Sequence, residues 1–223
     1  MEIMALEKTI VPTGMRRSPF FDLSWHRKYY ATGECQVQIR APDYSPDMAY
    51  IYTKDRPELG MIQSVKFTGD DGMVLLSGYF YEKRLKDKIV WPVFNGYGTR
   101  AALAMQMITA YKADLPLAPG TVADGGEKIE KQETGGELEK VLQTMLMADE
   151  KAIRCRYDYA GNKMYVDVCQ GRDRTQGQTE NNFVTFSRGF RNIRKVAVKD
   201  DSSNYKNYAI VGGAGEGAGR IYV

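Results

Sequence analysis

Residues 61–81 read MIQSVKF, TGDDG and MVLLSGYFY, two apolar runs separated by a short polar segment. Asp-Gly between two apolar runs is a strong signal for a β-hairpin, because these residues tolerate the positive φ that a tight turn requires. We therefore predict that 61–67 and 73–81 are the two strands of an antiparallel hairpin.

A strand and a short extended run are predicted before this hairpin. ECQVQIRA at 34–41 alternates apolar and polar residues, which is typical of a half-buried strand with one face in water. AYIY at 49–52 predicts a short strand within a turn-rich segment. These two segments extend the β-structure of the first half of the chain toward its N-terminus.

The second half of the chain predicts more antiparallel strands. IRCRYDY at 153–159 and KMYVDVCQ at 163–170 alternate in the same way around the turn Ala160-Gly161-Asn162, and so predict a second hairpin. A further strand pair is expected at 192–199 and 205–212, joined by a polar loop.

Two amphipathic helices are predicted, near 98–112 and 136–149. Thr99 is placed to cap the first helix, and Thr134 with Glu137 fits a capping box before the second. The apolar residues that recur at helical spacing are Ala104, Met107, Ile108 and Tyr111 in the first helix, and Leu138, Val141, Leu142, Met145 and Leu146 in the second.

Strands do not alternate regularly with helices, so the fold class is α+β, mainly antiparallel β in a barrel-like or split-sheet arrangement, with two helices. Residues 1–19 are expected to form an extended N-terminal arm. We expect a β-rich lobe with a helix at 20–112, a linker at 113–135, and a lobe of helix and β-hairpin at 136–223. A single compact domain over 20–213 is the alternative.

Composition excludes several classes of protein. The net charge is +3 and the pI about 8.6, which falls short of the concentrated basic face of a nucleic-acid-binding protein. No run approaches the roughly 18 apolar residues of a membrane span. The first fifteen residues contain Glu2, Glu7 and Lys8 and form no continuous apolar segment, so we expect no signal peptide and synthesis in a cytoplasm.

Candidate reactive residues are scattered. Cys35, Cys155 and Cys169 have no paired spacing, so buried thiols are expected rather than disulfides or a zinc site. His26 has no accompanying nucleophile signature and is interpreted as a polar residue at the start of a strand. The adjacent carboxylates Asp149 and Glu150, like 70–71 and 200–201, diverge too much to act as an acid–base pair. We therefore assign no catalytic, cofactor-binding or metal-binding residue.

Three other segments contain residues found in ligand-binding motifs, but each is interpreted as structural. The glycine-rich segment 212–219 has no room for the helix that a dinucleotide-binding loop requires. Arg172-Asp173-Arg174 could bind a phosphate, but surface ion pairs at a strand end are the expected role. The basic and aromatic residues at 186–195 are typical of single-stranded nucleic-acid binding and equally of strand alternation, which we favour.

Five segments in the order of the chain form a recognisable set. They are WHRKYYATGE at 25–34, LGMIQSV at 59–65, LSGYFYEKRL at 76–85 with KIV at 88–90, GRDRT at 171–175 and YKNYAIVGG at 205–213. This ordered set resembles the siphophage tail proteins of the ReqiPepy-phage-like group. Asp87-Lys88 departs from the family pattern, which has an arginine pair at that place.

This resemblance implies a structural protein of a phage or prophage tail, in the baseplate hub or tail tip. It implies no catalysis and no cofactor, and assembly as a homo-oligomer, a trimer in the family. The implied partners are tail-tube, distal-tail and tip proteins, without membrane or nucleic acid, in the virion tail. A phage-encoded cell-wall hydrolase or a carbohydrate-binding tail module is the alternative.

Overall fold

The computed structural model describes residues 2–7, 16–68, 72–193, 195–202, 213–215 and 219–220 of the 223-residue chain. The chain divides into two compact units, Met1–Arg172 and Asp173–Val223. All the helices and strands named below belong to the first unit.

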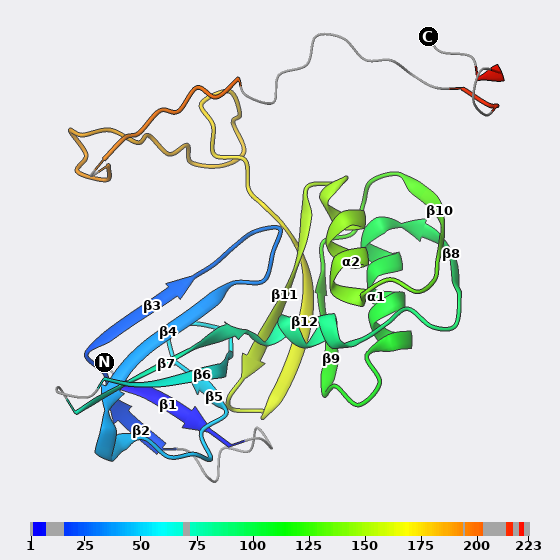
Figure 1. The fold of residues 1–223 in the computed structure, drawn as a ribbon. Coiled ribbons are helices and arrows are strands. Elements are labelled where there is room, and N and C mark those ends of the chain that lie inside the picture. Colours follow the sequence, from blue (N-terminus) through cyan, green and yellow to red (C-terminus); the bar gives the residue numbers. More distant parts are fainter. Residues whose placement is uncertain are drawn as a thin grey trace. The chain divides into compact units, whose positions relative to one another are not determined.

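Seven strands form the largest sheet (Figure 1). Their order across the sheet is β2-β1-β5-β6-β7-β4-β3, and every neighbouring pair is antiparallel. The predicted hairpin is confirmed as β6 and β7, which pair from Gly60 with Phe80 to Thr68 with Met73. In chain order the strands are β1 Glu2–Leu6, β2 Arg16–Pro19, β3 Asp22–His26, β4 Glu34–Arg40, β5 Tyr50–Tyr52, β6 Gly60–Thr68 and β7 Met73–Phe80.

The remaining strands form two smaller sheets. β11 pairs with β12 in the second predicted hairpin, and β9 joins β12 as a parallel neighbour, while β8 and β10 form an antiparallel pair. The mainly antiparallel α+β fold is thus confirmed. The elements are β8 Phe94–Thr99, α1 Arg100–Tyr111, β9 Leu117–Val122, β10 Lys128–Glu133, α2 Leu138–Met147, β11 Lys151–Asp158 and β12 Lys163–Gln170, with 3₁₀ turns at Ala41–Asp43 and at Tyr81–Asp87 (η3).

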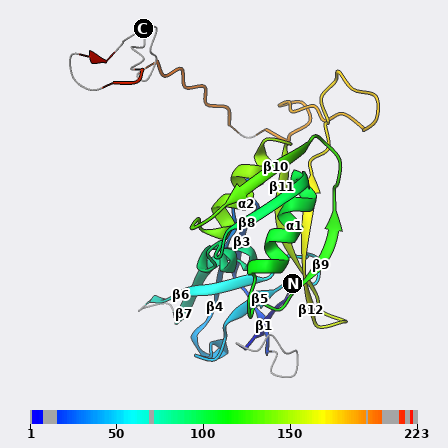
Figure 2. The ribbon, with the colours of Figure 1, turned by 90° about the vertical axis from the view of Figure 1, so that its right-hand side faces the viewer.

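The sheet of β11, β12 and β9 lies between the seven-stranded sheet and the two helices (Figure 1). Figure 2 shows α1 and α2 beside the β8–β10 pair. Tyr157 of β11 meets Tyr52 of β5 edge to face at 5.3 Å between ring centroids, and its N–H donates to the Pro57 carbonyl at 2.8 Å. No described helix is long and apolar enough to span a membrane.

Two apolar cores lie on opposite faces of the seven-stranded sheet. Alternation along β1 places Ile3 and Ala5 in one core and Met4 and Leu6 in the other. The smaller core is enclosed by the curl of the sheet and contains Ile3, Ala5, Val37, Ile39, Met48, Ile51, Val74 and Leu76. The larger core joins the opposite face to the helices and to β9, β11 and β12.

The start of α1 agrees with the predicted cap, and the start of α2 does not. The Thr99 hydroxyl accepts a hydrogen bond from the Ala102 N–H at 3.2 Å. Glu137 is itself the N-cap residue of α2 and makes no side-chain cap, so the predicted capping box is wrong. The reason is that this segment pairs with 88–90: the Gly135 N–H donates to the Val90 carbonyl and the Leu138 N–H to the Lys88 carbonyl.

Two expected irregular segments contain strands. Of the expected arm 1–19, residues 2–6 and 16–19 are the paired strands β1 and β2. The expected linker 113–135 contains β9 and β10, because its backbone pairs with β12 and with β8. The strand pair expected at 192–199 and 205–212 is not observed. Residues 205–212 lie outside the described residues, and the described part of 192–199 forms no strand.

Candidate assembly surface

The hairpin of β6 and β7 continues past its neighbours in the sheet. β5 pairs with β6 only through Tyr50–Met61 and Ile51–Gly60. From Gln63 to Thr68, β7 is the only described strand that pairs with β6. These residues, called the β6 edge below, present unpaired backbone groups along one side.

The β6 edge also carries exposed apolar side chains. Val65 and Phe67 pair with Leu76 and Val74, so they point toward the smaller core, yet they are 37% and 60% exposed. The Phe67 ring meets the Tyr44 ring edge to face at 5.5 Å between centroids and has no deeper cover. An unpaired strand edge with apolar side chains is a surface on which another strand can add.

A second apolar surface lies at residues 89–97, the 89–97 patch. Val90 is buried, and hydrogen bonds from its N–H to Gly136 and from Gly135 to its carbonyl hold this segment in place. The Tyr111 hydroxyl donates to the Pro92 carbonyl at 2.9 Å. The exposed side chains are Ile89 at 58%, Trp91 at 74%, Val93 at 45% and Tyr97 at 66%. Large apolar side chains exposed on a fixed backbone are characteristic of protein interfaces.

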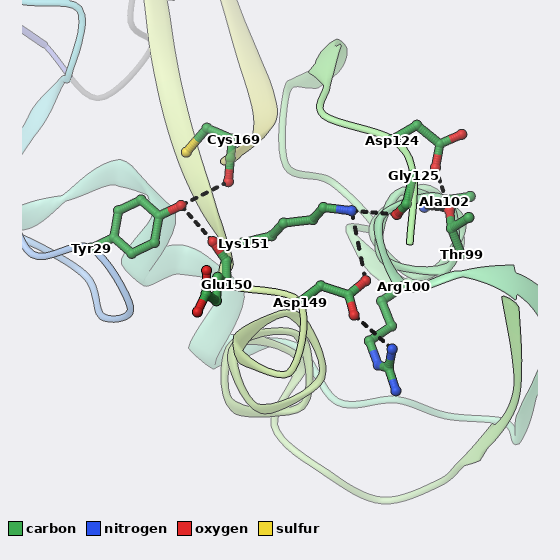
Figure 3. Close-up of polar contacts among 10 residues, drawn as sticks. All are labelled: Tyr29, Thr99, Arg100, Ala102, Asp124, Gly125, Asp149, Glu150, Lys151 and Cys169. Atoms are coloured by element: carbon green, nitrogen blue, oxygen red, sulfur yellow. Dashed lines mark hydrogen bonds and ion pairs between the residues drawn. The ribbon is translucent and has the colours of Figure 1, made fainter. Parts of the chain in front are cut away.

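Buried charges occur in the interior, where they join elements (Figure 3). Lys151 is 3% exposed; its ammonium donates to the Gly125 carbonyl at 2.5 Å and lies 3.7 Å from Asp149. Asp149 also accepts from Arg100 at 2.7 Å. The group thereby ties the end of α2 and the start of β11 to the start of α1 and the β9–β10 loop. These contacts stabilise the packing of the helices against β11.

Tyr29 makes a similar tie to the β11–β12 hairpin. Its hydroxyl donates to the Glu150 carbonyl at 2.8 Å (Figure 3). The same hydroxyl accepts from the Gly171 N–H at 2.5 Å. Burial raises the pKa of this hydroxyl. The contact anchors the 27–32 loop on the ends of β11 and β12.

Three carboxylates are buried near this loop. Glu58 is held by Arg27 at 2.6 Å and Glu139 by Lys83 at 3.1 Å, whereas Glu82 has an oxygen with no hydrogen-bond partner. Glu82 and Glu139 line a hollow of about 10 Å³, room for a single water molecule. A glycosidase would need two carboxyl groups across a cleft that admits a sugar, and this space is too small for one.

Of the residues considered in the sequence, His26 and Cys35 lie on the neighbouring strands β3 and β4 and line one hollow. His26 ends β3 rather than starting a strand, and its Nε2 lies 2.7 Å from the Ser24 hydroxyl. Cys35 and Cys155 are buried and Cys169 is partly buried, all three as free thiols. No described group of three or more His, Cys, Asp or Glu side chains could hold a metal ion.

The remaining motifs lie in or near the second unit. Asp173 accepts from the Thr175 N–H at 2.8 Å, which is local turn geometry. Arg188, Arg191 and Lys195 are exposed. The turn residues 70–71 and, of the glycine-rich segment 212–219, residues 212 and 216–218 fall outside the described residues.

The sequence did not single out the exposed positions or the buried carboxylates. Val65 and Phe67 continue the alternation of β6 just as core residues would, so nothing local distinguishes them. Trp91 followed by Pro92 was the one available signal, because proline interrupts regular pairing and leaves an apolar residue in a loop. Burial of Glu58, Glu82 and Glu139 depends on packing between distant segments.

The fold is similar to that of a solved prophage tail protein. The tail protein gp18 of a Listeria monocytogenes EGD-e prophage matches with a TM-score of 0.55 and 9% identity, over 81% of this chain and 56% of that one. The 43 kDa tail protein of prophage MuSo2 from Shewanella oneidensis matches at 0.49 with 14% identity, over 79% and 57%. A tail protein from Neisseria meningitidis MC58 matches at 0.47 with 16% identity, over 74% and 49%.

The chain belongs to the family of siphovirus ReqiPepy6 Gp37-like proteins, whose model matches residues 18–223. The chain spans about half the length of the solved structures it matches. Comparison with curated protein sequences gave no match.

Proposed function

We propose that this chain is a baseplate-hub or tail-tip component that acts through contacts between subunits and has no catalytic role. The observation that carries the proposal is the β6 edge, where Phe67 is 60% exposed on a strand segment with one described partner. The 89–97 patch supplies a second apolar contact. An unpaired strand edge and exposed apolar side chains promote aggregation of an isolated protein. In an assembly the same groups are covered by contacts with neighbouring subunits.

The proposed assembly is a homo-oligomer, a trimer as in the resemblance, in contact with tail-tube, distal-tail or tip proteins in the virion. We propose synthesis in the cytoplasm of the bacterial host. Addition of a strand from a neighbouring subunit to the β6 edge would satisfy its backbone groups and cover Phe67. The absence of catalysis is supported by the small hollow at Glu82 and Glu139.

The assembly proposal is tested by placing a charge on each apolar surface. We expect Phe67→Lys and Trp91→Lys to block formation of complete tails in the phage or prophage that encodes the chain, as seen by negative-stain electron microscopy. Both side chains are largely exposed, so the melting temperature of the purified variants should stay within a few degrees of the parent protein.

Met147→Lys is the matched control, because Met147 is 50% exposed at the end of α2 and outside both surfaces. Normal tails from the two test variants would refute the proposed surfaces. Cell-wall zymography of the purified chain tests the absence of catalysis, and clearing that a single Asp or Glu substitution abolishes would refute it.

A further inference from the structure

One face of the seven-stranded sheet carries buried apolar side chains at one side and mainly polar side chains at the other. Tyr50 and Tyr52 of β5, with Met4 and Leu6 of β1, lie in the larger core on this face. Continuing across β6, β7, β4 and β3, most residues on the same face are polar and at least partly exposed, and the apolar exceptions are Met61, Met73 and Leu75. The polar half of the sheet is therefore open to a ligand.

The register places polar side chains in rows across four strands. Ser24 of β3 is opposite Gln36 of β4, Gln36 is opposite Ser77 of β7, and Ser77 is opposite Ser64 of β6. In the next row, His26, Glu34 and Tyr79 are opposite one another in the same manner. Adjacent strands lie ~4.8 Å apart, so each row presents a series of polar groups at a short repeat.

These rows line a hollow of about 350 Å³, which also includes Gln63. The register between β6 and β7 shifts between Ile62 and Ser64, at a bulge opposite Gly78. A Cβ atom at Gly78 would lie 1.8 Å from the Met61 carbonyl oxygen, so only glycine fits here. The absence of a side chain at Gly78 therefore lets β6 and β7 approach each other at the bulge, which borders the hollow.

The lining is hydrogen-bonding and close to neutral. The Glu34 carboxylate is paired with the Lys28 ammonium, which lowers its pKa and balances its charge. The other polar groups are mainly hydroxyls and amides, which both donate and accept. Tyr79 adds an aromatic ring, 5.4 Å from the Lys83 ammonium. A phosphate would find no cluster of cations here.

We propose that this hollow, lined by Ser24, Gln36, Gln63, Ser64, Ser77 and Tyr79, binds a neutral saccharide of one or two sugar units. Sugars carry many hydroxyls that donate and accept, which matches the amides and hydroxyls of the rows. The volume lies at the lower end of the ~300–1,000 Å³ range of small-molecule sites. The hollow shares Gln63 and Ser64 with the β6 edge, but it lies on the face of the sheet opposite to the side chains of Val65 and Phe67.

The test uses the full chain and saturation-transfer difference NMR. The probes are glucose, galactose, N-acetylglucosamine and their β-linked disaccharides, with glycerol phosphate as a charged polyol for comparison. We expect binding of at least one neutral sugar in the millimolar range. The double variant Gln36→Ala/Ser77→Ala should weaken binding by about tenfold or more, because two hydrogen-bonding groups are lost.

Gln38→Ala is the matched control, since Gln38 lies on the same face of β4 two residues beyond the hollow. Its affinity should stay within about twofold of the parent protein. Ser24→Ala is a second test variant that does not alter β4 or β7. The proposal is refuted if no neutral sugar binds at ~10 mM, if only glycerol phosphate binds, or if the test variants bind as the control does. Failure of this test leaves the assembly proposal intact, because that proposal is measured on tails.

Discussion

Glu82 is a buried carboxyl group in η3 whose protonation depends on the fold. Burial raises its pKa from 4.5 to about 7, and the nearby Glu58 carboxylate acts in the same direction. Backbone groups of Glu82 and Cys155 act in the opposite direction but do not compensate. One carboxyl oxygen of Glu82 has no hydrogen-bond partner. Ionisation of this group at neutral pH therefore destabilises the folded protein, because the buried carboxylate is not solvated by water.

This pKa predicts a pH dependence of stability. The folded pKa lies above the unfolded one, so the contribution of Glu82 is present below about 4.5 and is lost as the pH rises through about 7. The loss is at most about 3 kcal/mol. We expect Glu82→Gln to remove this fall and to raise the melting temperature at pH 8 relative to the parent protein. Thermal unfolding at pH 5 and pH 8 measures both effects.

Glu34→Gln is the control for the Glu82 experiment. The pKa of Glu34 is lowered, first by its hydrogen bond from Lys28, so its contribution to stability has the opposite pH dependence. Removing Glu34 should therefore leave the fall between pH 5 and pH 8 in place. An unchanged fall in Glu82→Gln would show that Glu82 is not its source.

At the scale of elements, local signals placed the hairpins and helices, and contacts between segments changed their details. The β6–β7 hairpin follows from apolar runs and Asp-Gly. The cap of α2 differs from its sequence pattern because 135–138 pairs with 88–90 instead of closing a capping box. Similarly, β9 was not predicted, because LAPGTV has little alternation and is a strand only beside β12.

The cap of α1 gives an element-scale prediction. Thr99 accepts from the Ala102 N–H and donates to Asp124, so Thr99→Ala removes a cap and a tie to the β9–β10 loop. We expect a loss of about 1–2 kcal/mol in the free energy of unfolding, measured with urea. Thr109→Ala is the control, because the Thr109 hydroxyl only donates to the Met105 carbonyl on the exposed side of α1. Equal losses in the two variants would contradict the cap.

At the scale of the whole molecule, the two lobes expected from the sequence and the two units of the structure predict different fragments in limited proteolysis. The unit Met1–Arg172 contains all the described helices and strands, and the described residues from 173 to 202 form none. Trypsin at low ratio should cut first near Arg172, Arg174 and Arg188, which are exposed, and leave a resistant fragment ending there. Mass spectrometry identifies the cut sites. First cuts at Lys112 or Lys128 would support the linker at 113–135 instead.

The candidate surfaces were less predictable than the fold. An apolar residue at an alternating position is equally suited to a core and to an interface, so Phe67 and Val37 look alike in the sequence. Their exposure differs because Val37 on β4 has β3 on one side and β7 on the other, whereas β5 ends before it reaches Phe67 on β6. The polar hollow depends likewise on four strands being adjacent.

The amino-acid sequence by itself determined the class of fold, the two hairpins, the two helices and the family resemblance, because these rest on periodicity, turn residues and short ordered motifs. Tertiary structure alone decided which strand edge is unpaired, which apolar side chains remain exposed and which carboxyl groups are buried. The physical reason is that exposure and pairing depend on neighbours that are distant in the chain, whereas alternation and turn chemistry are local.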